Sequence, residues 1–99
     1  MSILADVALA LRIKSTSYND EIQDLIDGAT ADLLLSGILQ SKIDTLETDE
    51  PDILIKRCII LYNKANFGLD NQDSAKFEAS YESLKIHLML SAEYTEEVV

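Results

Sequence analysis

The sequence predicts an all-α protein, a small bundle of about four helices with an irregular loop between the second and the third. Apolar residues recur at intervals of three and four in four separate stretches, which is the period of an amphipathic helix. The 99 residues are 47% apolar and 26% charged, the balance of a folded chain with one core. We expect a single domain over residues 1–92 and a flexible acidic tail over 93–99.

The first helix is predicted to begin after Ser2, whose hydroxyl can accept a hydrogen bond from a backbone N–H group in the first turn. Its apolar positions follow the helical period at Leu4, Val7, Ala8 and Leu11. Arg12 and Lys14 lie at its C-terminal end, where positive charge interacts favourably with the helix dipole. One short amphipathic helix is therefore expected before the polar stretch over 14–20.

The second helix is predicted to follow that polar stretch, with Ser17 or Asn19 as its cap. Its buried stripe consists of Ile22, Leu25, Ile26, Ala29 and Leu33. Gly28 lies inside this helix and costs about 1 kcal/mol relative to Ala. We therefore expect a neighbouring helix to pass close to it. Gly37 is typical of a helix end, and Ile38 is expected to make the usual apolar contact beyond it.

Residues 38–51 show no helical period and are predicted to form a loop, with room for a short extended piece. Pro51 is placed as the first residue of the third helix, because its missing N–H group would have no partner there. That helix is expected to run to Phe67 and stop at Gly68. The fourth helix is predicted to start near Asp73, which can cap it. Its core stripe consists of Phe77, Tyr81, Leu84 and Leu88.

The charge is large and unevenly distributed. The chain carries −10, from 18 acidic and eight basic side chains, and this opposes approach to nucleic acid or to an anionic membrane. Ten acidic residues and one basic residue, Lys42, lie within residues 20–52, so this segment carries −9. Three basic residues follow at Lys56, Arg57 and Lys64. We therefore expect one acidic and one basic surface in the same chain.

The sequence predicts a soluble protein made in the cytoplasm. Its start lacks the basic region and the cleavage site of a secretory signal. No stretch approaches the roughly 18 apolar residues that span a bilayer. A single cysteine also rules out a disulfide within the chain.

The third helix, over residues 52–67, is apolar nearly all round. One broad face is predicted to be core, yet Ile53, Ile60 and Phe67 fall on the opposite, basic face at intervals of seven residues. Such a helix is either central in its own domain or packed against another subunit. In the first alternative, the first helix or the 38–51 loop covers these three side chains within one chain.

The second alternative is a subunit interface in which a basic, apolar surface of one copy meets an acidic surface of the next. The two surfaces differ, so the contact is heterologous and able to close into a ring. The residues predicted on the basic side are Ile53, Lys56, Arg57, Ile60, Lys64 and Phe67. Their predicted acidic counterpart consists of Asp20, Asp24, Asp27, Asp44 and Glu47.

No catalytic, cofactor or metal site is predicted, and we expect no enzyme. Cys58 lies on the apolar face of the third helix, where a cysteine behaves as a small hydrophobe. His87, the only histidine, has no second ligand at metal-binding spacing, so a packing role at the surface or at the boundary of the core is favoured. The acidic run over 44–52 lacks the alternating ligands and the glycine of an EF-hand loop. Three glycines are too few for a phosphate-binding loop.

Three segments together resemble the phage head-tail connector, or DNA-packaging, family. They are DEIQDLIDGATADLLLSGI at 20–38, IKRCIILYNKANFG at 55–68 and FEASYESLKIHLMLSAEY at 77–94. The likeness spans most of the chain in the family's order, and the last segment is the most specific. Family members vary between the second and third helices, so residues 39–51 match no particular portal contact.

The resemblance implies a virion structural protein. It implies a ring of copies beneath the portal that joins the portal to the tail and lets genome DNA pass through. The implied partners are other copies of the chain, the portal protein and a tail-completion protein, with no sequence-specific nucleic acid, no membrane and no cofactor. The implied location is the head-tail junction of the virion, after synthesis in the host cytoplasm.

A second function class stays open beside this one, a small acidic helical regulatory or adaptor protein that binds a basic protein partner. A neighbourhood of capsid and portal genes favours the connector, whereas a host operon favours the regulator. An enzyme with an acidic metal site ranks last, and metal-dependent thermal stabilisation would be its sign.

The interface hypothesis predicts the effect of a single substitution. If the chain self-associates through the basic face of the third helix, Ile60→Asp dissociates the oligomer without unfolding the subunit, because the added charge is desolvated at the contact. Sedimentation and circular dichroism measure the two effects. An unchanged oligomer contradicts the hypothesis.

Overall fold

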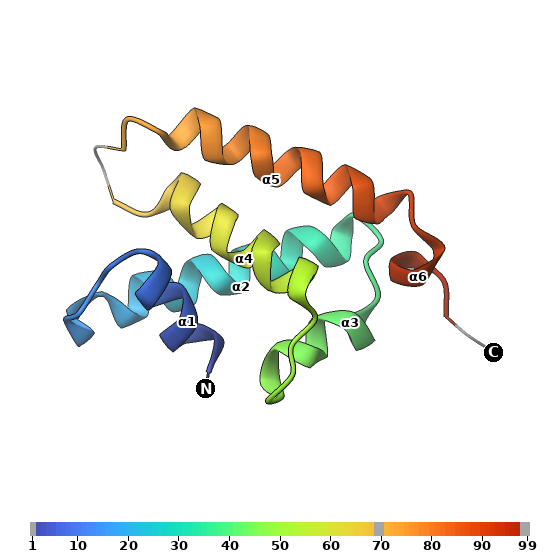
Figure 1. Ribbon diagram of the computed structural model, residues 1–99, viewed down its shortest axis with the longest axis horizontal. Helices are drawn as coiled ribbons and strands as arrows, with labels where there is room; N and C mark the ends of the chain where they lie inside the picture. Colours follow the sequence, from blue (N-terminus) through green and yellow to red (C-terminus); the bar gives the residue numbers. More distant parts are fainter. Residues whose placement is uncertain (1, 69–70, 98–99) are drawn as a thin grey trace.

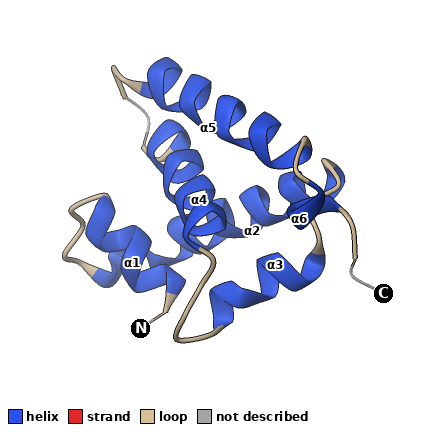
Figure 2. Ribbon diagram, turned by 45° about the vertical axis from the view of Figure 1, so that its right-hand side comes forward, coloured by secondary structure: helices blue, strands red, loops and turns tan. Residues whose placement is uncertain are grey.

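The computed structural model describes residues 2–68 and 71–97 of the chain (Figures 1 and 2). All regular elements in these residues are helical, so the predicted all-α class is confirmed. The elements are α1 (Ile3–Ala10), a 3₁₀ turn (Thr16–Tyr18), α2 (Asn19–Leu35), α3 (Gln40–Asp44), a second 3₁₀ turn (Thr45–Glu47), α4 (Ile53–Asn66), α5 (Ser74–Met89) and α6 (Ala92–Thr95). The described residues thus hold six α-helices where about four were predicted, because α3 and α6 are too short to display a period.

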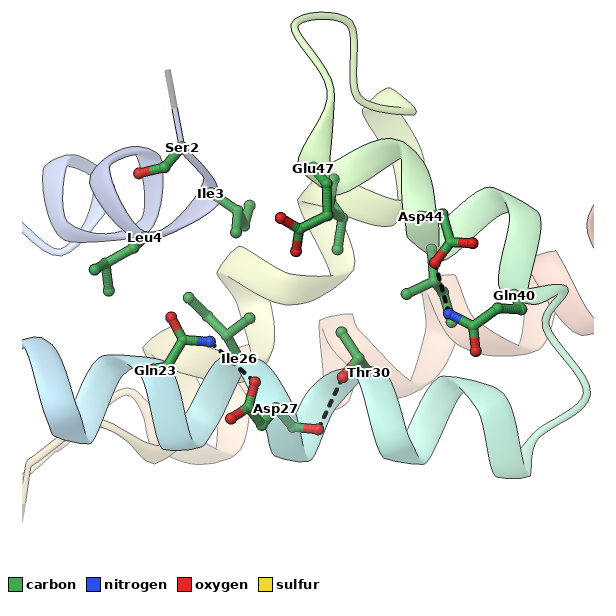
Figure 3. A pocket seen from close by; sticks show the side chains of 12 residues that line it. Ser2, Ile3, Leu4, Gln23, Ile26, Asp27, Thr30, Gln40, Asp44 and Glu47 are labelled. Carbon is green, nitrogen blue, oxygen red and sulfur yellow. Dashed lines mark hydrogen bonds between the residues drawn. The ribbon is translucent and has the colours of Figure 1, made fainter.

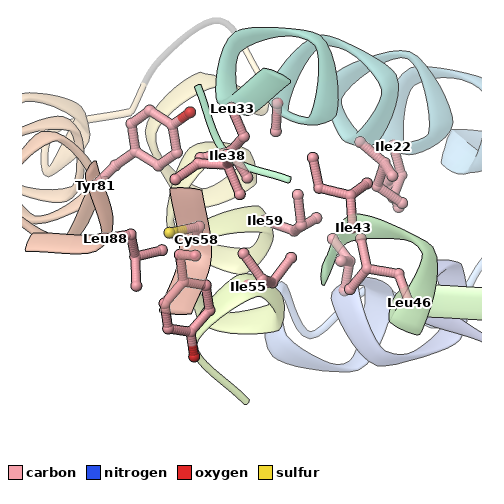
Figure 4. Packing of buried hydrophobic residues seen from close by; sticks show 14 residues of the cluster. Ile22, Leu33, Ile38, Ile43, Leu46, Ile55, Cys58, Ile59, Tyr81 and Leu88 are labelled. Carbon is pink, nitrogen blue, oxygen red and sulfur yellow. The ribbon is translucent and has the colours of Figure 1, made fainter. Parts of the chain in front are cut away.

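Helix α4 occupies the centre of the fold. It packs against α5, α2 and α1, and Figure 1 shows it between α5 and α2. Ile55, Cys58 and Ile59 on α4 are completely buried and lie in the middle of the apolar cluster in Figure 4. The predicted core role of Cys58 is therefore confirmed.

The start of α4 differs from the prediction by two residues. The Asp52 carboxylate accepts hydrogen bonds from the N–H groups of Leu54 and Ile55, both at 3.0 Å, so Asp52 is the cap and the helix begins at Ile53. Pro51 precedes the cap and is not the first helical residue. An aspartate that accepts hydrogen bonds from two N–H groups stabilises the first turn of a helix. A proline is only compatible with the first helical position, because its missing N–H group would have no partner there.

The start of α2 also differs from the prediction. Neither Ser17 nor Asn19 caps this helix. Ser15 accepts a hydrogen bond from the Ser17 N–H group at 3.1 Å and so caps the 3₁₀ turn. Helix α2 then continues directly from that turn, with Tyr18 in the cap position and no capping side chain.

Several predicted boundaries are confirmed. Ser2 accepts a hydrogen bond from the Ala5 N–H group at 3.1 Å and starts α1. Gly37 has φ +97°, and the Ile38 N–H group donates to the Leu33 carbonyl at 3.0 Å, which closes the end of α2. Asp73 takes the cap position of α5, although its side chain makes no capping bond.

The predicted loop over residues 38–51 is largely helical. Helix α3 and the second 3₁₀ turn occupy residues 40–47, and Ile43 and Leu46 join the core. No extended strand forms in this segment. Two apolar residues three positions apart are enough to hold one helical turn against a core but too few to reveal a period in the sequence.

The predicted tail boundary at residue 93 is wrong. Residues 92–95 form α6, and Tyr94 is only 7% exposed. Its hydroxyl donates to Asp52 Oδ2 at 2.9 Å, and its carbonyl accepts the Leu39 N–H group at 2.8 Å. The folded domain therefore extends through α6, and the last part of the predicted tail, residues 98–99, lies outside the described residues.

The predicted close approach at Gly28 is confirmed. A Cβ atom at this position would lie 3.1 Å from the Oη atom of Tyr62 on α4 and 3.7 Å from two of its ring carbons. The Tyr62 ring also meets the Tyr81 ring of α5 edge to face, with centroids 5.3 Å apart. Gly28 thus lets one tyrosine of α4 contact both neighbouring helices.

This contact predicts coupling between two substitutions. Gly28→Ala gains about 1 kcal/mol of helix propensity but pushes the Tyr62 hydroxyl. In a Tyr62→Phe background only ordinary carbon contacts remain. We expect Gly28→Ala to raise the free energy of unfolding by about 0.5–1 kcal/mol in that background and by less beside the natural tyrosine. Urea unfolding of the four proteins measures this, and equal effects in both backgrounds would contradict it.

Candidate functional site

The predicted apolar positions on the basic face of α4 do not form one open stripe. Ile53 is 79% exposed, whereas Ile60 and Phe67 are half-buried and pack against the core of the same chain. The Phe67 ring meets the Tyr18 ring edge to face at 5.6 Å between centroids. The structure thus fits the intrachain alternative at Ile60 and Phe67 and leaves Ile53 available for a neighbour.

Two of the three basic side chains on this face have partners within the chain. Lys56 Nζ lies 3.0 Å from Asp6 Oδ2 and links α4 to α1. Lys64 Nζ lies 5.4 Å from the centroid of the Phe77 ring on α5. Arg57 is exposed and makes no ion pair within the described residues. Among the predicted basic side chains, Arg57 is therefore the best placed to meet another molecule.

The five residues of the predicted acidic counterpart are all exposed. The structure brings Asp27, Asp44 and Glu47 to one hollow of about 590 Å³ between α1, α2 and the segment from α3 to the second 3₁₀ turn (Figure 3). We call it the acidic pocket. Asp20 and Asp24 do not line it; they lie nearer the start of α2.

The acidic pocket has an apolar floor and polar walls. Its apolar lining consists of Ile3, Leu4, Ile26, Ile43 and Leu46, and no basic residue lines it. Gln23 Nε2 donates to Asp27 Oδ1 at 2.9 Å, and Gln40 Nε2 donates to Asp44 Oδ1 at 2.7 Å. These amides orient two of the three carboxylates but leave their negative charge uncompensated. The pocket therefore suits a cationic group attached to an apolar stem.

A second hollow, of about 790 Å³, lies between α4 and α5 and is hereafter the α4–α5 groove. Its lining consists of Leu54, Arg57, Leu61, Ala79, Ser80, Ser83, Leu84, His87, Leu88, Ser91 and Tyr94. Arg57 and His87 are the basic side chains in the lining of the groove, and no carboxylate lines the groove. Sequence reasoning missed this groove, although the small residues Ala79, Ser80 and Ser83 on one side of α5 were a signal for it.

The groove and α2 lie on different sides of α4. At about 100° per residue, the positions of Leu54, Arg57 and Leu61 centre roughly 110° around α4 from Tyr62. Tyr62 is the side chain that contacts Gly28 of α2. The groove therefore does not open toward α2.

A partly buried polar network holds α2 to α5. Asp32 Oδ2 accepts hydrogen bonds from the Tyr81 hydroxyl at 2.6 Å and from Lys85 Nζ at 2.9 Å, and Lys85 also lies 3.2 Å from Glu82. Desolvation raises the pKa of Asp32, but the bonds from Tyr81 and Lys85 outweigh it and leave this pKa below its usual value. Burial and the hydrogen bond to Asp32 raise the pKa of Tyr81. These directions describe a charged carboxylate with two donors, which is a structural tie.

Cys58 and His87 are the other side chains that the sequence offered for catalysis or metal binding. Burial raises the pKa of the Cys58 thiol to about 12, so it stays protonated inside the core. His87 is exposed at the edge of the α4–α5 groove, which agrees with the surface or boundary position predicted for it. Within residues 2–68 and 71–97, no group of three or more His, Cys, Asp or Glu side chains is placed to hold a metal ion. None of the helices described is both long and apolar enough to cross a membrane.

Comparison with known families defines the class of protein. A family model described as "Phage connector protein" matches residues 3–95, nearly the whole described chain. The chain therefore belongs to the phage connector protein family, as its resemblance implied, and has a connector-type structural role that indicates a virion component. No curated protein and no solved structure matches it.

The exposed fractions of Ile53 and Ile60 decide which substitution on α4 can disrupt assembly without destabilising the subunit. Ile60 is half-buried, so Ile60→Asp should lower the free energy of unfolding by about 1–3 kcal/mol through its effect on the core. Ile53 is open to solvent, so Ile53→Asp should leave this free energy within about 0.5 kcal/mol of the natural protein. Urea unfolding of the isolated subunit measures both. A marked loss of stability in Ile53→Asp would contradict the exposed placement of Ile53.

Proposed function

We propose that the protein is a head-tail connector subunit that assembles into a ring, joins the portal of the capsid to the tail and lets DNA pass. The family match over residues 3–95 carries this proposal, because it spans α1 to α6 rather than one segment. The proposed partners are further copies of the chain, the portal protein and a tail-completion protein. The proposed location is the head-tail junction, after a period in the host cytoplasm.

The surfaces of the subunit support a ring. The α4–α5 groove is apolar with Arg57 and His87, whereas the exposed side of α2 and the acidic pocket carry carboxylates. A closed ring of identical subunits uses two different surfaces of each copy, one meeting the other around the circle. Opposite charge on those surfaces favours the correct pairing over like-with-like contact.

The net charge supports a role around DNA rather than on it. A chain that carries −10 repels a phosphate backbone unless basic residues gather at the contact. Carboxylates exposed toward an opening would keep the passing duplex from adhering to the wall. We therefore propose that the subunit guides DNA without binding it, and that the role needs neither a cofactor nor catalysis.

One observation favours the alternative of an acidic adaptor that binds a basic protein. The acidic pocket sets three carboxylates around an apolar floor, which suits a lysine- or arginine-bearing apolar segment of a partner. In a connector, the same pocket would receive such a segment from the portal or from the tail-completion protein. The two functions differ in whether the bound complex is a ring.

Mixing the purified chain with the portal protein of the same phage tests the proposal. Electron microscopy should show an added ring of density on one end of the portal, and the two proteins should sediment together. The portal alone, and the portal with an unrelated acidic helical protein of similar size, serve as controls. A chain that leaves the portal unchanged when present in large excess would contradict the connector function.

A further inference from the structure

The outward side of α2 is a stripe with two chemically different halves. At about 100° per residue, its members fall within an arc of roughly 100° on the side of α2 away from the core. They are Asp20, Asp24, Asp27, Ala31, Leu34 and Leu35, and all are exposed. Leu35 is 89% exposed and Leu34 is 39% exposed, so the last turn of α2 presents uncovered apolar side chains. We call this the α2 stripe.

The α4–α5 groove has the complementary arrangement. Leu61 of α4 and Leu84 of α5, with the small residues Ala79 and Ser80, line one end. Helices α4 and α5 run in opposite directions (Figure 1). Arg57, which precedes Leu61 by four residues on α4, therefore lies toward the other end, together with Leu54 and His87. The groove thus holds its basic side chains away from the Leu61 end, as the α2 stripe holds its carboxylates away from Leu34 and Leu35.

Part of the α2 stripe matches the groove in length. From Asp27 to Leu35 the stripe covers eight residues, roughly 12 Å of helix. On α5 the groove runs from Ala79 to Leu88, roughly 14 Å. The whole stripe from Asp20 to Leu35 is longer, roughly 22 Å, so Asp20 and Asp24 extend beyond the Arg57 end of the groove.

We propose that the α4–α5 groove receives the α2 stripe of a second copy of this chain. Leu34 and Leu35 of one copy lie between Leu61 and Leu84 of the next, and Asp27 faces Arg57. This inference rests on the proposed ring function and names the contact that would build the ring.

Within one chain the two surfaces do not meet. The α2 stripe points away from the core, while the groove lies on another side of α4, which is itself packed against α2. Each copy consequently offers one groove and one stripe, and the contact repeats head to tail. A symmetric dimer could pair stripe with groove twice only if both surfaces opened on one face of the subunit, and here they lie on different sides of α4. A symmetric contact of stripe with stripe would place Asp20, Asp24 and Asp27 against their equivalents, which repel them.

Cysteine cross-linking of the full chain tests the contact. Leu35→Cys and Ser80→Cys place thiols on the two proposed surfaces, and a short bifunctional maleimide joins thiols that come close. The double variant should give a ladder of dimers, trimers and higher products. A mixture of the two single variants should give dimers only, because each product has used its one reactive thiol. The natural protein, whose Cys58 is completely buried, should give none.

A matched control uses Leu35→Cys with Asp49→Cys, since Asp49 is exposed but lies in neither surface. This pair should give no ladder. Charge reversal supplies a second arm: Arg57→Glu should lower the yield of the ladder about tenfold, and adding Asp27→Arg should restore it. Circular dichroism verifies that each variant is folded.

The reactions are run on the chain alone at high concentration and after assembly on the portal. A ladder specific to the proposed pair in either sample supports the contact. If rings form on the portal but the ladder is absent, or if the control pair cross-links equally, the contact is wrong and the connector function stands. If the ladder forms but the chain never binds the portal, the contact stands and the connector function falls.

Discussion

The burial of α4 on three sides is the constraint on which the rest of the structure depends. Ile55, Cys58 and Ile59 are inaccessible to solvent, and α1, α2 and α5 all pack on this helix. Burying each large side chain of this kind contributes about 1.5–3 kcal/mol, a large part of the net stability of so small a domain. The two other long helices, α2 and α5, pack on α4 far more than on each other, so their positions follow from its faces, while α1 also packs on α2 and α6 packs on α5. The Asp32 network between α2 and α5 is the main polar exception.

The long helices could be predicted from the sequence because each displays several turns of apolar period and ends at a distinctive residue. Gly37 and Gly68 mark the ends of α2 and α4 through positive φ angles that most residues avoid. Helices α3 and α6 could not be predicted in this way. Their single turns hold because Ile43, Leu46 and Tyr94 reach a core that other segments build, and this information lies outside the local sequence.

The candidate surfaces were predicted only in part, for a related reason. A spacing of seven residues drifts around a helix by about 20° per repeat, so Ile53, Ile60 and Phe67 do not share one environment. Tyr18, from a turn distant in sequence, covers Phe67, and the Lys56–Asp6 ion pair brings α1 to the same side of α4. The acidic residues were placed more reliably because charged side chains stay at the surface whichever way the helices pack. The groove between α4 and α5 depends on how two helices meet, and the small residues Ala79, Ser80 and Ser83 of α5 are its one local signal.

The contact of α6 with the middle of the chain has a consequence for the order of folding. Tyr94 closes over Asp52 and Leu39, so the segments that begin α3 and α4 are completed by one of the last described turns. The Tyr94–Asp52 hydrogen bond joins residues 42 positions apart, so a long loop must close before Tyr94 can join the core. Contacts of this separation form late in folding, so α6 is expected to dock after the α4–α5 pair has formed. A chain cut before α6 would lose the buried Tyr94 ring together with its hydrogen bonds to Asp52 and Leu39.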